Sequence, residues 1–258
     1  MSATSTALQA HQLRVELGGR AVLHGISADF KAGAWSCIVG PNGVGKSTLL
    51  KALAGLLPSV GTIDLFGQPM QSWSAQQRAQ QLAWLAQDET GGLHLKVRDV
   101  VMLGRLPHLG LLESVTALDT QACEQARQAT HIEHLADTLL GTLSAGQQQR
   151  VRLARALATQ AKLLLLDEPL ANLDPPHQLD CVQLIRSLVS SGITVISVLH
   201  ELPMALLSDE LLILREGKVM HQGASNSEAT HRALEQVFDQ KIRVLQADGH
   251  WVTVPRMH

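Results

Sequence analysis

Short apolar runs separated by amphipathic stretches organise most of the chain. Branched and polar residues alternate from about Leu13 to Ser27 around Gly18–Gly19, which predicts the two strands of a hairpin. Three later apolar runs have the length and composition of buried strands, and a segment bounded by glycines is also predicted to be a strand. These four predicted strands are Trp35–Val39, Gly61–Gly67, Leu163–Leu166 and Ile193–Leu199.

Helical spacing of apolar residues fills the intervals between these strands. Leucines recur on one side of residues 47–56, and a second helix is predicted over His177–Ser190. Strands that alternate with helices favour an α/β fold with a parallel sheet. Short helical segments dominate residues 88–160, which are expected to form a helical subdomain inserted within one domain, residues 1–258. Residues 222–258 are expected to be a short β/α extension.

Composition and charge narrow the class of protein. The 258 residues are 45% hydrophobic and 17% charged, as in a globular protein, and the formal net charge of −2 gives no general attraction to nucleic acid. Cys37, Cys123 and Cys181 lie far apart without a CxxC pair, which is typical of a reduced, cytosolic chain. The first residues lack the pattern of a secretion signal, and no apolar run approaches the length of a membrane span.

The sequence GPNGVGKST fits the phosphate-binding loop G-x-x-x-x-G-K-[ST], and it follows a predicted strand and opens a predicted helix. Its backbone N–H groups and the helix N-terminus suit phosphate oxygens. Lys46 is expected to reach the β- and γ-phosphates, and the Ser47 hydroxyl is expected to bind Mg²⁺. The nucleotide-binding residues predicted here are Gly40, Pro41, Asn42, Gly43, Val44, Gly45, Lys46, Ser47 and Thr48.

The sequence LLLLDEP places two carboxylates at the end of a predicted parallel strand. The carboxyl ends of such strands are where α/β proteins bind ligands. Asp167 is expected to hold the Mg²⁺ shell, and Glu168 is placed to polarise a water molecule against the γ-phosphate of a nucleotide. On its own, this pattern would equally suit a buried strand followed by a solvated acidic turn.

Taken together, the motifs resemble those of the ABC-type ATPases over nearly the whole chain. GPNGVGKST, LSAGQQQR, LLLLDEP, ANLD and the strand-end histidine of TVISVLH occur in the order of that family. The resemblance implies a P-loop NTPase core with a parallel sheet, an N-terminal antiparallel β subdomain and an inserted α-helical subdomain. It also implies an ATPase that binds ATP and Mg²⁺.

The same resemblance gives a role to the turn LSAGQ, which has no base, nucleophile or metal ligand of its own. In this family two such domains pack head to tail, and the signature turn of one subunit faces the γ-phosphate held by the other. The residues implied are Ser144, Ala145, Gly146 and Gln147. Ala145 replaces the usual first glycine, and its N–H can still donate if its φ angle is negative.

Four further positions are implied by matching motifs. Gln87, after LAWLA, matches the glutamine that contacts Mg²⁺ and the attacking water, and Asp174 of ANLD matches a loop that meets its twin across the dimer. His200 matches the histidine that binds the γ-phosphate. Leu17 stands where many relatives stack an aromatic ring on adenine, in a chain that contains no tyrosine.

Finer resemblance favours the ATPase of a metal-chelate importer, whose cargo would be an iron-siderophore complex, haem or cobalamin. An iron-siderophore complex or cobalamin is favoured over haem. It rests on GQPMQSWSAQQRAQQLAWLAQ, VRDVVMLGRLPHLG, LDPPHQ and VFDQKIRVLQADGHWVTVP. It implies a homodimer at the cytoplasmic face of the bacterial inner membrane, beneath two permease subunits and served indirectly by a periplasmic binding protein. Residues Val97–Gly110 are expected to expose apolar side chains to a short helix of the permease.

Two other classes share these motifs. A soluble ABC ATPase that acts on nucleic acid or ribosomes would not co-purify with membrane subunits, and an exporter would move its cargo in the opposite direction. His131 and His134, in HIEH, have a spacing compatible with a metal, although a solvated helix face explains them more simply.

Overall fold

The computed structural model describes residues 5–87, 91–110 and 113–256. These residues belong to two compact units, the first formed by residues 1–72 with 189–258 and the second by residues 73–188. The domain bounds that the sequence suggests, 88–160 and 222–258, stay predictions.

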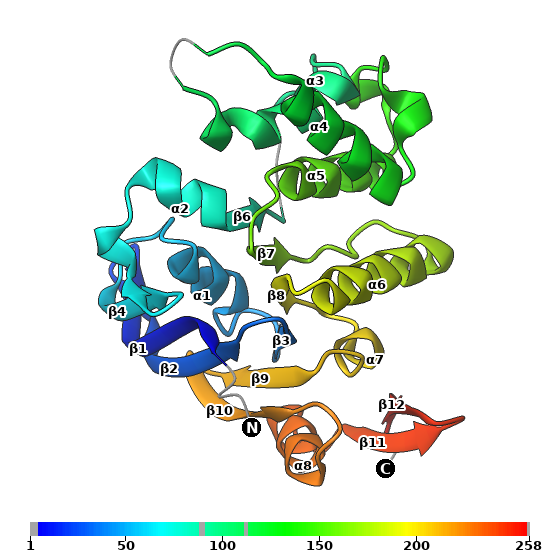
Figure 1. Cartoon of the computed structure of the whole chain (residues 1–258). Helices are drawn as coiled ribbons and strands as arrows, with labels where there is room; N and C mark the ends of the chain where they lie inside the picture. Colours follow the sequence, from blue (N-terminus) through cyan, green and yellow to red (C-terminus); the bar gives the residue numbers. More distant parts are fainter. Residues whose placement is uncertain (1–4, 88–90, 111–112, 257–258) are drawn as a thin grey trace. The chain divides into compact units, whose positions relative to one another are not determined.

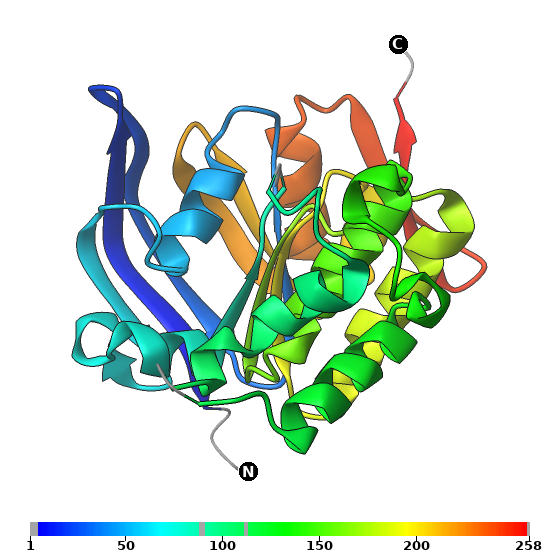
Figure 2. The same cartoon turned by 90° about the horizontal axis from the view of Figure 1, so that it is seen from above.

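The first unit contains a four-stranded antiparallel sheet in the order β2-β1-β4-β5. Its two long strands lie side by side as the predicted hairpin (Figure 2), which extends beyond residues 13–27 at both ends. Alternate residues of these strands are buried, the pattern expected of a sheet with one solvated face. The strands are β1 (Thr6–Leu17), β2 (Arg20–Lys31), β4 (Val60–Leu65) and β5 (Gln68–Pro69).

A second group of strands in this unit follows the order β10-β9-β3-β8. The central strand β3 is parallel to both neighbours, and β10 is antiparallel to β9. Every residue of β3 and β8 is buried, as predicted from their largely apolar sequences, and the buried polar residues among them are Ser36, Thr194 and Ser197. The bounds are β3 (Trp35–Val39), β8 (Thr194–Val198), β9 (Glu210–Arg215) and β10 (Lys218–Ala224).

Helices and a terminal hairpin complete the first unit. Helix α1 (Lys46–Leu53) begins directly after the glycine-rich loop and buries its leucines. Helix α8 contacts β10 and the hairpin β11–β12, beside which it is drawn in Figure 1. The remaining elements are η1 (Met70–Ser72), α7 (Leu202–Ala205), α8 (Glu228–Val237), β11 (Ile242–Ala247) and β12 (His250–Pro255).

The second unit combines a parallel strand pair with a group of helices. Strand β6 (Leu82–Leu85) pairs with β7 (Leu163–Asp167). Figure 1 draws helices α3, α4 and α5 near one another. They share an apolar core that includes Val97, Cys123 and Val151. The helices are α2 (Ala75–Gln81), α3 (Val97–Met102), α4 (Ala117–Ala129), α5 (Ala145–Ala158) and α6 (Pro175–Ser190), with 3₁₀ segments η2 (Leu103–His108), η3 (Glu133–Leu135) and η4 (Leu140–Thr142).

The α/β fold class is confirmed, with parallel strands, an antiparallel N-terminal sheet and a group of helices. The three cysteines are buried free thiols. Burial raises the pKa of Cys37 and Cys181 to about 12, so neither is a thiolate at neutral pH. Within the described residues, no helix has both the length and the apolar character needed to cross a bilayer.

Candidate functional site

The glycine-rich loop of the first unit joins the buried end of β3 to the first turn of α1. Gly45 has φ 100° and precedes the helix, in a backbone region that favours glycine. A Cβ atom on Gly40 would lie 2.2 Å from the carbonyl oxygen of Leu214, so no larger residue fits there without a shift of the backbone. The loop sequence is therefore matched to this path of the backbone.

The side chain of Lys46 folds back over the glycine-rich loop and bonds to its backbone. Its Nζ donates hydrogen bonds to the carbonyl oxygens of Gly40, at 2.9 Å, and Pro41, at 3.0 Å, and the residue is only 5% exposed. Ser47 and Thr48 follow in the first turn of α1 and are half-buried. A buried ammonium, a helix N-terminus and a turn of backbone N–H groups are the kinds of group that suit an anion.

Two other predicted residues of the first unit lie at strand ends. Leu17 ends β1, pairs with Arg20 across the hairpin turn and is 42% exposed. His200 comes shortly after the buried strand β8 and is exposed. Both side chains are accessible to a ligand.

The carboxylates of the second unit follow the wholly buried strand β7. Asp167 is its last residue and is fully buried. Glu168 has φ 53°, a conformation that costs a residue other than glycine about 1–3 kcal/mol and that is concentrated at functional sites. Gln87 lies just beyond β6, the parallel neighbour of β7, and is exposed.

The turn that precedes α5 is an N-cap with reciprocal hydrogen bonds. Ser144 Oγ accepts a hydrogen bond from the Gln147 backbone N–H at 3.3 Å, and the Ser144 N–H donates to Gln147 Oε1 at 3.0 Å. Ala145 is the first helical residue and is not among the residues with positive φ. The alanine therefore keeps its N–H in the helical geometry that the usual glycine would have.

This turn lies against the loop that follows β7. A Cβ atom on Gly146 would be 3.0 Å from the carbonyl oxygen of Asn172. The structure thus brings together Ser144–Gln147 and the loop from Glu168 to Asp174, although the two segments are separate in the sequence.

Asp174 immediately precedes helix α6 and is hydrogen-bonded to Nδ1 of His177, in the first turn of that helix. This hydrogen bond lowers the pKa of Asp174 below its usual value. The contact of His177 with Asp174 was not predicted from the sequence, although the D-x-x-H spacing at a helix start was available as a signal. Gln149 was also missed; its side chain is buried and donates to the carbonyl oxygen of Glu168 at 3.1 Å.

Two sequence interpretations are wrong. His131 and His134 do not share a helix, because α4 ends at Ala129, His131 has φ 54° and His134 lies in η3. In the segment Val97–Gly110, the three valines are core residues rather than exposed. Among the described residues, no cluster of three or more His, Cys, Asp or Glu side chains could hold a metal ion.

Most of the motifs described above lie within the part of the chain that matches a known family. The sequence pattern of the family described as ABC transporter matches residues 23–171, from strand β2 to the loop after β7. The chain belongs to the ABC transporter family. Because ATP-binding subunits of this family hydrolyse ATP, the chain is an ATPase.

The curated relatives include import proteins for three kinds of cargo. The ferric enterobactin transport ATP-binding protein of Escherichia coli K12 is 36% identical, with coverage of 95% of this chain and 92% of the relative. The hemin import ATP-binding protein of Aliivibrio fischeri is 36% identical, with 95% coverage of both chains. A cobalamin import ATP-binding protein of Halobacterium salinarum is 37% identical over 90% of this chain and 58% of the relative.

A solved ABC transporter described as of the metal-chelate type, in an inward-facing conformation, contains a chain with the same fold. The two chains are 26% identical, superpose with a TM-score of 0.81 and cover 98% of each other. The ABC ATPase fold therefore extends over essentially the whole chain.

Proposed function

We propose that this chain is the ATP-hydrolysing subunit of an importer that takes up a metal chelate, namely an iron-siderophore complex, haem or cobalamin. The observation that carries the proposal is the pair of anion-binding elements in one chain of this family. One is the loop closed by Lys46, and the other is the N-terminal turn of α5 at Ser144. Importer ATP-binding proteins among the relatives support the direction and the cargo class.

Each site residue has a role that its chemistry suits. Lys46 and the loop N–H groups would bind the phosphates, Leu17 would contact the base, and His200 would donate to the γ-phosphate. Glu168 would accept the proton of the attacking water, which Gln87 orients. The signature residues Ser144–Gln147 and the loop at Asp174 would serve the nucleotide held by a second copy of the chain.

The donor set fits Mg²⁺. This ion prefers oxygen ligands and keeps several waters and substrate oxygens, so it needs few protein ligands. The Ser47 hydroxyl, the buried Asp167 carboxylate and the Gln87 side-chain oxygen are the ligands that we assign. When bound, Mg²⁺ would neutralise charge on the β- and γ-phosphate oxygens.

In this proposal, ATP binding closes a homodimer, and hydrolysis reopens it beneath two permease subunits at the cytoplasmic face of the inner membrane. A periplasmic binding protein would deliver the chelate to the permease. The direct test is to co-express the chain with candidate permease subunits, isolate the complex from membranes and measure ATPase activity with and without them. We expect a stable complex and a stimulated rate, and a chain that binds no permease would contradict the proposal.

The 3₁₀ segment η2 is the surface that we assign to the permease. Leu106 is 58% exposed on it, whereas the neighbouring Leu109 is half-buried. A short amphipathic helix needs such an apolar contact surface. This surface is the part of Val97–Gly110 that remains exposed once the valines are placed in the core.

Leu106→Glu should uncouple transport from ATP hydrolysis, because a charge cannot be buried against an apolar helix without a large desolvation cost. We expect uptake by the reconstituted complex to fall while the ATPase activity of the isolated subunit stays within about twofold of wild type. Leu179→Glu, at an exposed leucine of α6, is the matched control. Equal loss of both activities in Leu106→Glu would show that Leu106 supports only the fold.

Leu17→Tyr should tighten ATP binding, because a stacked aromatic ring adds about 0.5–1.5 kcal/mol beyond the area that it buries. This corresponds to about 2- to 12-fold in affinity. Isothermal titration would measure it, with Leu56→Tyr at another exposed leucine as the control. Unchanged affinity would mean that Leu17 does not face the base, and a wild-type preference for ATP over GTP of about 100-fold or more would mean that base contacts already dominate.

A further inference from the structure

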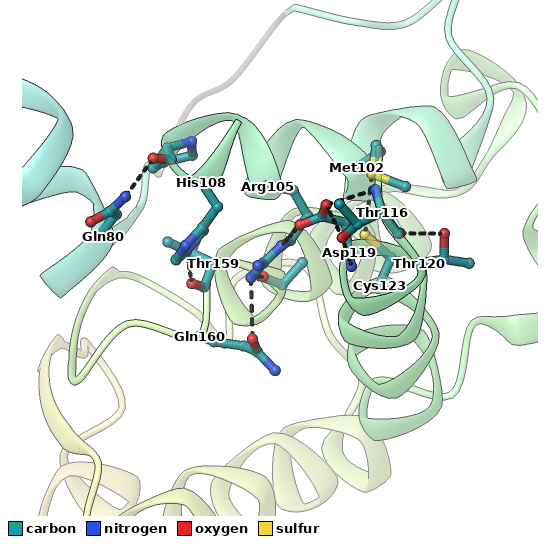
Figure 3. Close-up of polar contacts among 12 residues, drawn as sticks. Gln80, Met102, Arg105, His108, Thr116, Asp119, Thr120, Cys123, Thr159 and Gln160 are labelled. Atoms are coloured by element: carbon teal, nitrogen blue, oxygen red, sulfur yellow. Dashed lines mark hydrogen bonds and ion pairs between the residues drawn. The ribbon is translucent and has the colours of Figure 1, made fainter. Parts of the chain in front are cut away.

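Side chains of η2 cap the C-terminal end of helix α5, as Figure 3 shows. Arg105 Nη1 donates to the carbonyl oxygen of Ala158 at 2.8 Å and to Gln160 Oε1 at 3.2 Å. His108 Nε2 lies 2.8 Å from the carbonyl oxygen of Thr159, to which it donates. The last carbonyls of a helix have no partner within the helix, and a cation beside them is favourable. Backbone N–H groups of Thr159 and Gln160 bond the carbonyls of Ala156 and Leu157, and segment η2 supplies donors to the next two carbonyls, those of Ala158 and Thr159.

The same arginine fastens η2 to helix α4. Arg105 Nε donates to Asp119 Oδ1 at 2.8 Å, and both side chains are buried. Asp119 also accepts hydrogen bonds from the backbone N–H and hydroxyl of Thr116, and these bonds together with Arg105 lower its pKa to about 2. A buried ion pair contributes little net stability, but its geometry fixes the parts that it joins.

Close packing restrains η2 from two further sides. A Cβ atom on Gly104 would lie 2.2 Å from the carbonyl oxygen of Arg155, so the backbone of η2 lies directly on α5. From α2, the side-chain amides of Gln76 and Gln80 both donate to the carbonyl oxygen of Pro107. Segment η2 is thus in contact with α5 through its backbone as well as through the side chains of Arg105 and His108.

Helix α5 has a second fastening nearer its other end. The buried side chain of Gln149 donates to the carbonyl oxygen of Glu168 at 3.1 Å. It lies nine residues before Ala158, which is about 14 Å along an α-helix. This hydrogen bond joins α5 to the backbone of Glu168, which has φ 53°.

We propose that α5 joins the permease-facing segment η2 to Glu168, with Arg105 as the positioning residue at one end and Gln149 as the positioning residue at the other. This connection runs within one chain and does not involve Gln87. It rests on the proposed function, because it assumes that a permease contacts η2 and that Glu168 is the base.

Arg105→Lys tests the first fastening. Lysine keeps the charge that faces Asp119 but cannot reach Asp119, Ala158 and Gln160 together. In the reconstituted complex, we expect the stimulation of ATPase activity by the permease to fall by about 2- to 30-fold, the range for residues that modulate coupling. The KM for ATP and the rate of the isolated subunit should stay within about twofold of wild type. Arg127→Lys, on α4, is the matched control.

Gln149→Met tests the second fastening, since methionine keeps the shape of glutamine but donates no hydrogen bond. We expect kcat of the isolated subunit to fall about 10- to 100-fold, as for a slightly misplaced catalytic group, and the stimulation by the permease to fall by about 2- to 30-fold, as in Arg105→Lys. The KM for ATP should not change. Gln125→Met, on the exposed face of α4, should have no effect on either constant.

The double variant Arg105→Lys with Gln149→Met tests whether the contacts of Arg105 and Gln149 act through the same connection. If they do, Arg105→Lys should add no further loss of stimulation once Gln149 is replaced. Fully additive effects would overturn the connection, as would wild-type stimulation in Arg105→Lys or wild-type kcat in Gln149→Met.

If Arg105→Lys folds poorly, Arg105→Met with Asp119→Asn replaces the buried ion pair as a unit and keeps an acceptor for Thr116. We expect the same loss of stimulation in this variant. A wild-type chain that the permease does not stimulate at all would instead refute the proposed function, so the two failures are distinguishable.

Discussion

Glu168→Gln should still bind ATP but hydrolyse it about 10²–10⁴-fold more slowly, which is the usual contribution of a positioned general base. Glutamine keeps the shape of the side chain and its hydrogen-bonding groups, yet it cannot accept the proton of the attacking water. Steady-state phosphate release would measure the rate, and equilibrium titration would measure the binding.

A second result should accompany this loss. Because hydrolysis reopens the dimer in this account, Glu168→Gln should accumulate as an ATP-bound dimer on gel filtration. Glu133→Gln, at an exposed position in η3, is the matched control and should behave as wild type. Near-normal turnover in Glu168→Gln would remove this residue from the mechanism.

Ser144→Arg should abolish hydrolysis without abolishing ATP binding, because the turn is proposed to serve the nucleotide of the opposite subunit. Arginine fills the space that a γ-phosphate would occupy in front of α5. Ser74→Arg is an unusually close control, since Ser74 and Gln77 form the same reciprocal N-cap at the start of α2. Loss of the N-cap alone costs about 0.5–2 kcal/mol of stability in either place. A loss of ATPase activity in Ser144→Arg that Ser74→Arg does not share is therefore due to the contact with nucleotide.

A mixture of Ser144→Arg and Lys46→Ala proteins tests which subunit the turn serves. In a mixed dimer, one composite site carries both changes and the other carries neither. We expect the mixture to recover ATPase activity above either variant alone. If the turn acted within its own chain, every site would be damaged and no activity would return.

The strands were the most predictable part of the fold. The buried strand β3 has the bounds that its apolar run predicts, because a strand buried on both faces is apolar at nearly every position, with Ser36 as the exception in β3. Helix α2 was not predicted, since none of its residues is buried and its sequence therefore lacks an apolar stripe. Helix α6 begins two residues before the predicted start, at Pro175, where proline suits the first helical position.

The candidate site also contains some residues that the sequence predicts and others that it does not. Residues within contiguous motifs, such as Gly40–Thr48, could be assigned from sequence because their chemistry depends on local spacing. Arg105 and Gln149 could not, because each acts on a backbone carbonyl far along the chain, at Ala158 and Glu168. Only the fold brings these groups within hydrogen-bonding distance.

Uptake by sealed vesicles is the most direct test of import by this protein. Vesicles would carry the permease with this chain on the inside, together with ATP, and would be offered a ferric siderophore, haem or cobalamin with its binding protein on the outside. We expect one of these chelates to accumulate inside only with ATP, and vesicles containing the Glu168→Gln chain not to accumulate it. Export of the chelate, or no ATP-dependent accumulation of any of the three, would contradict the account.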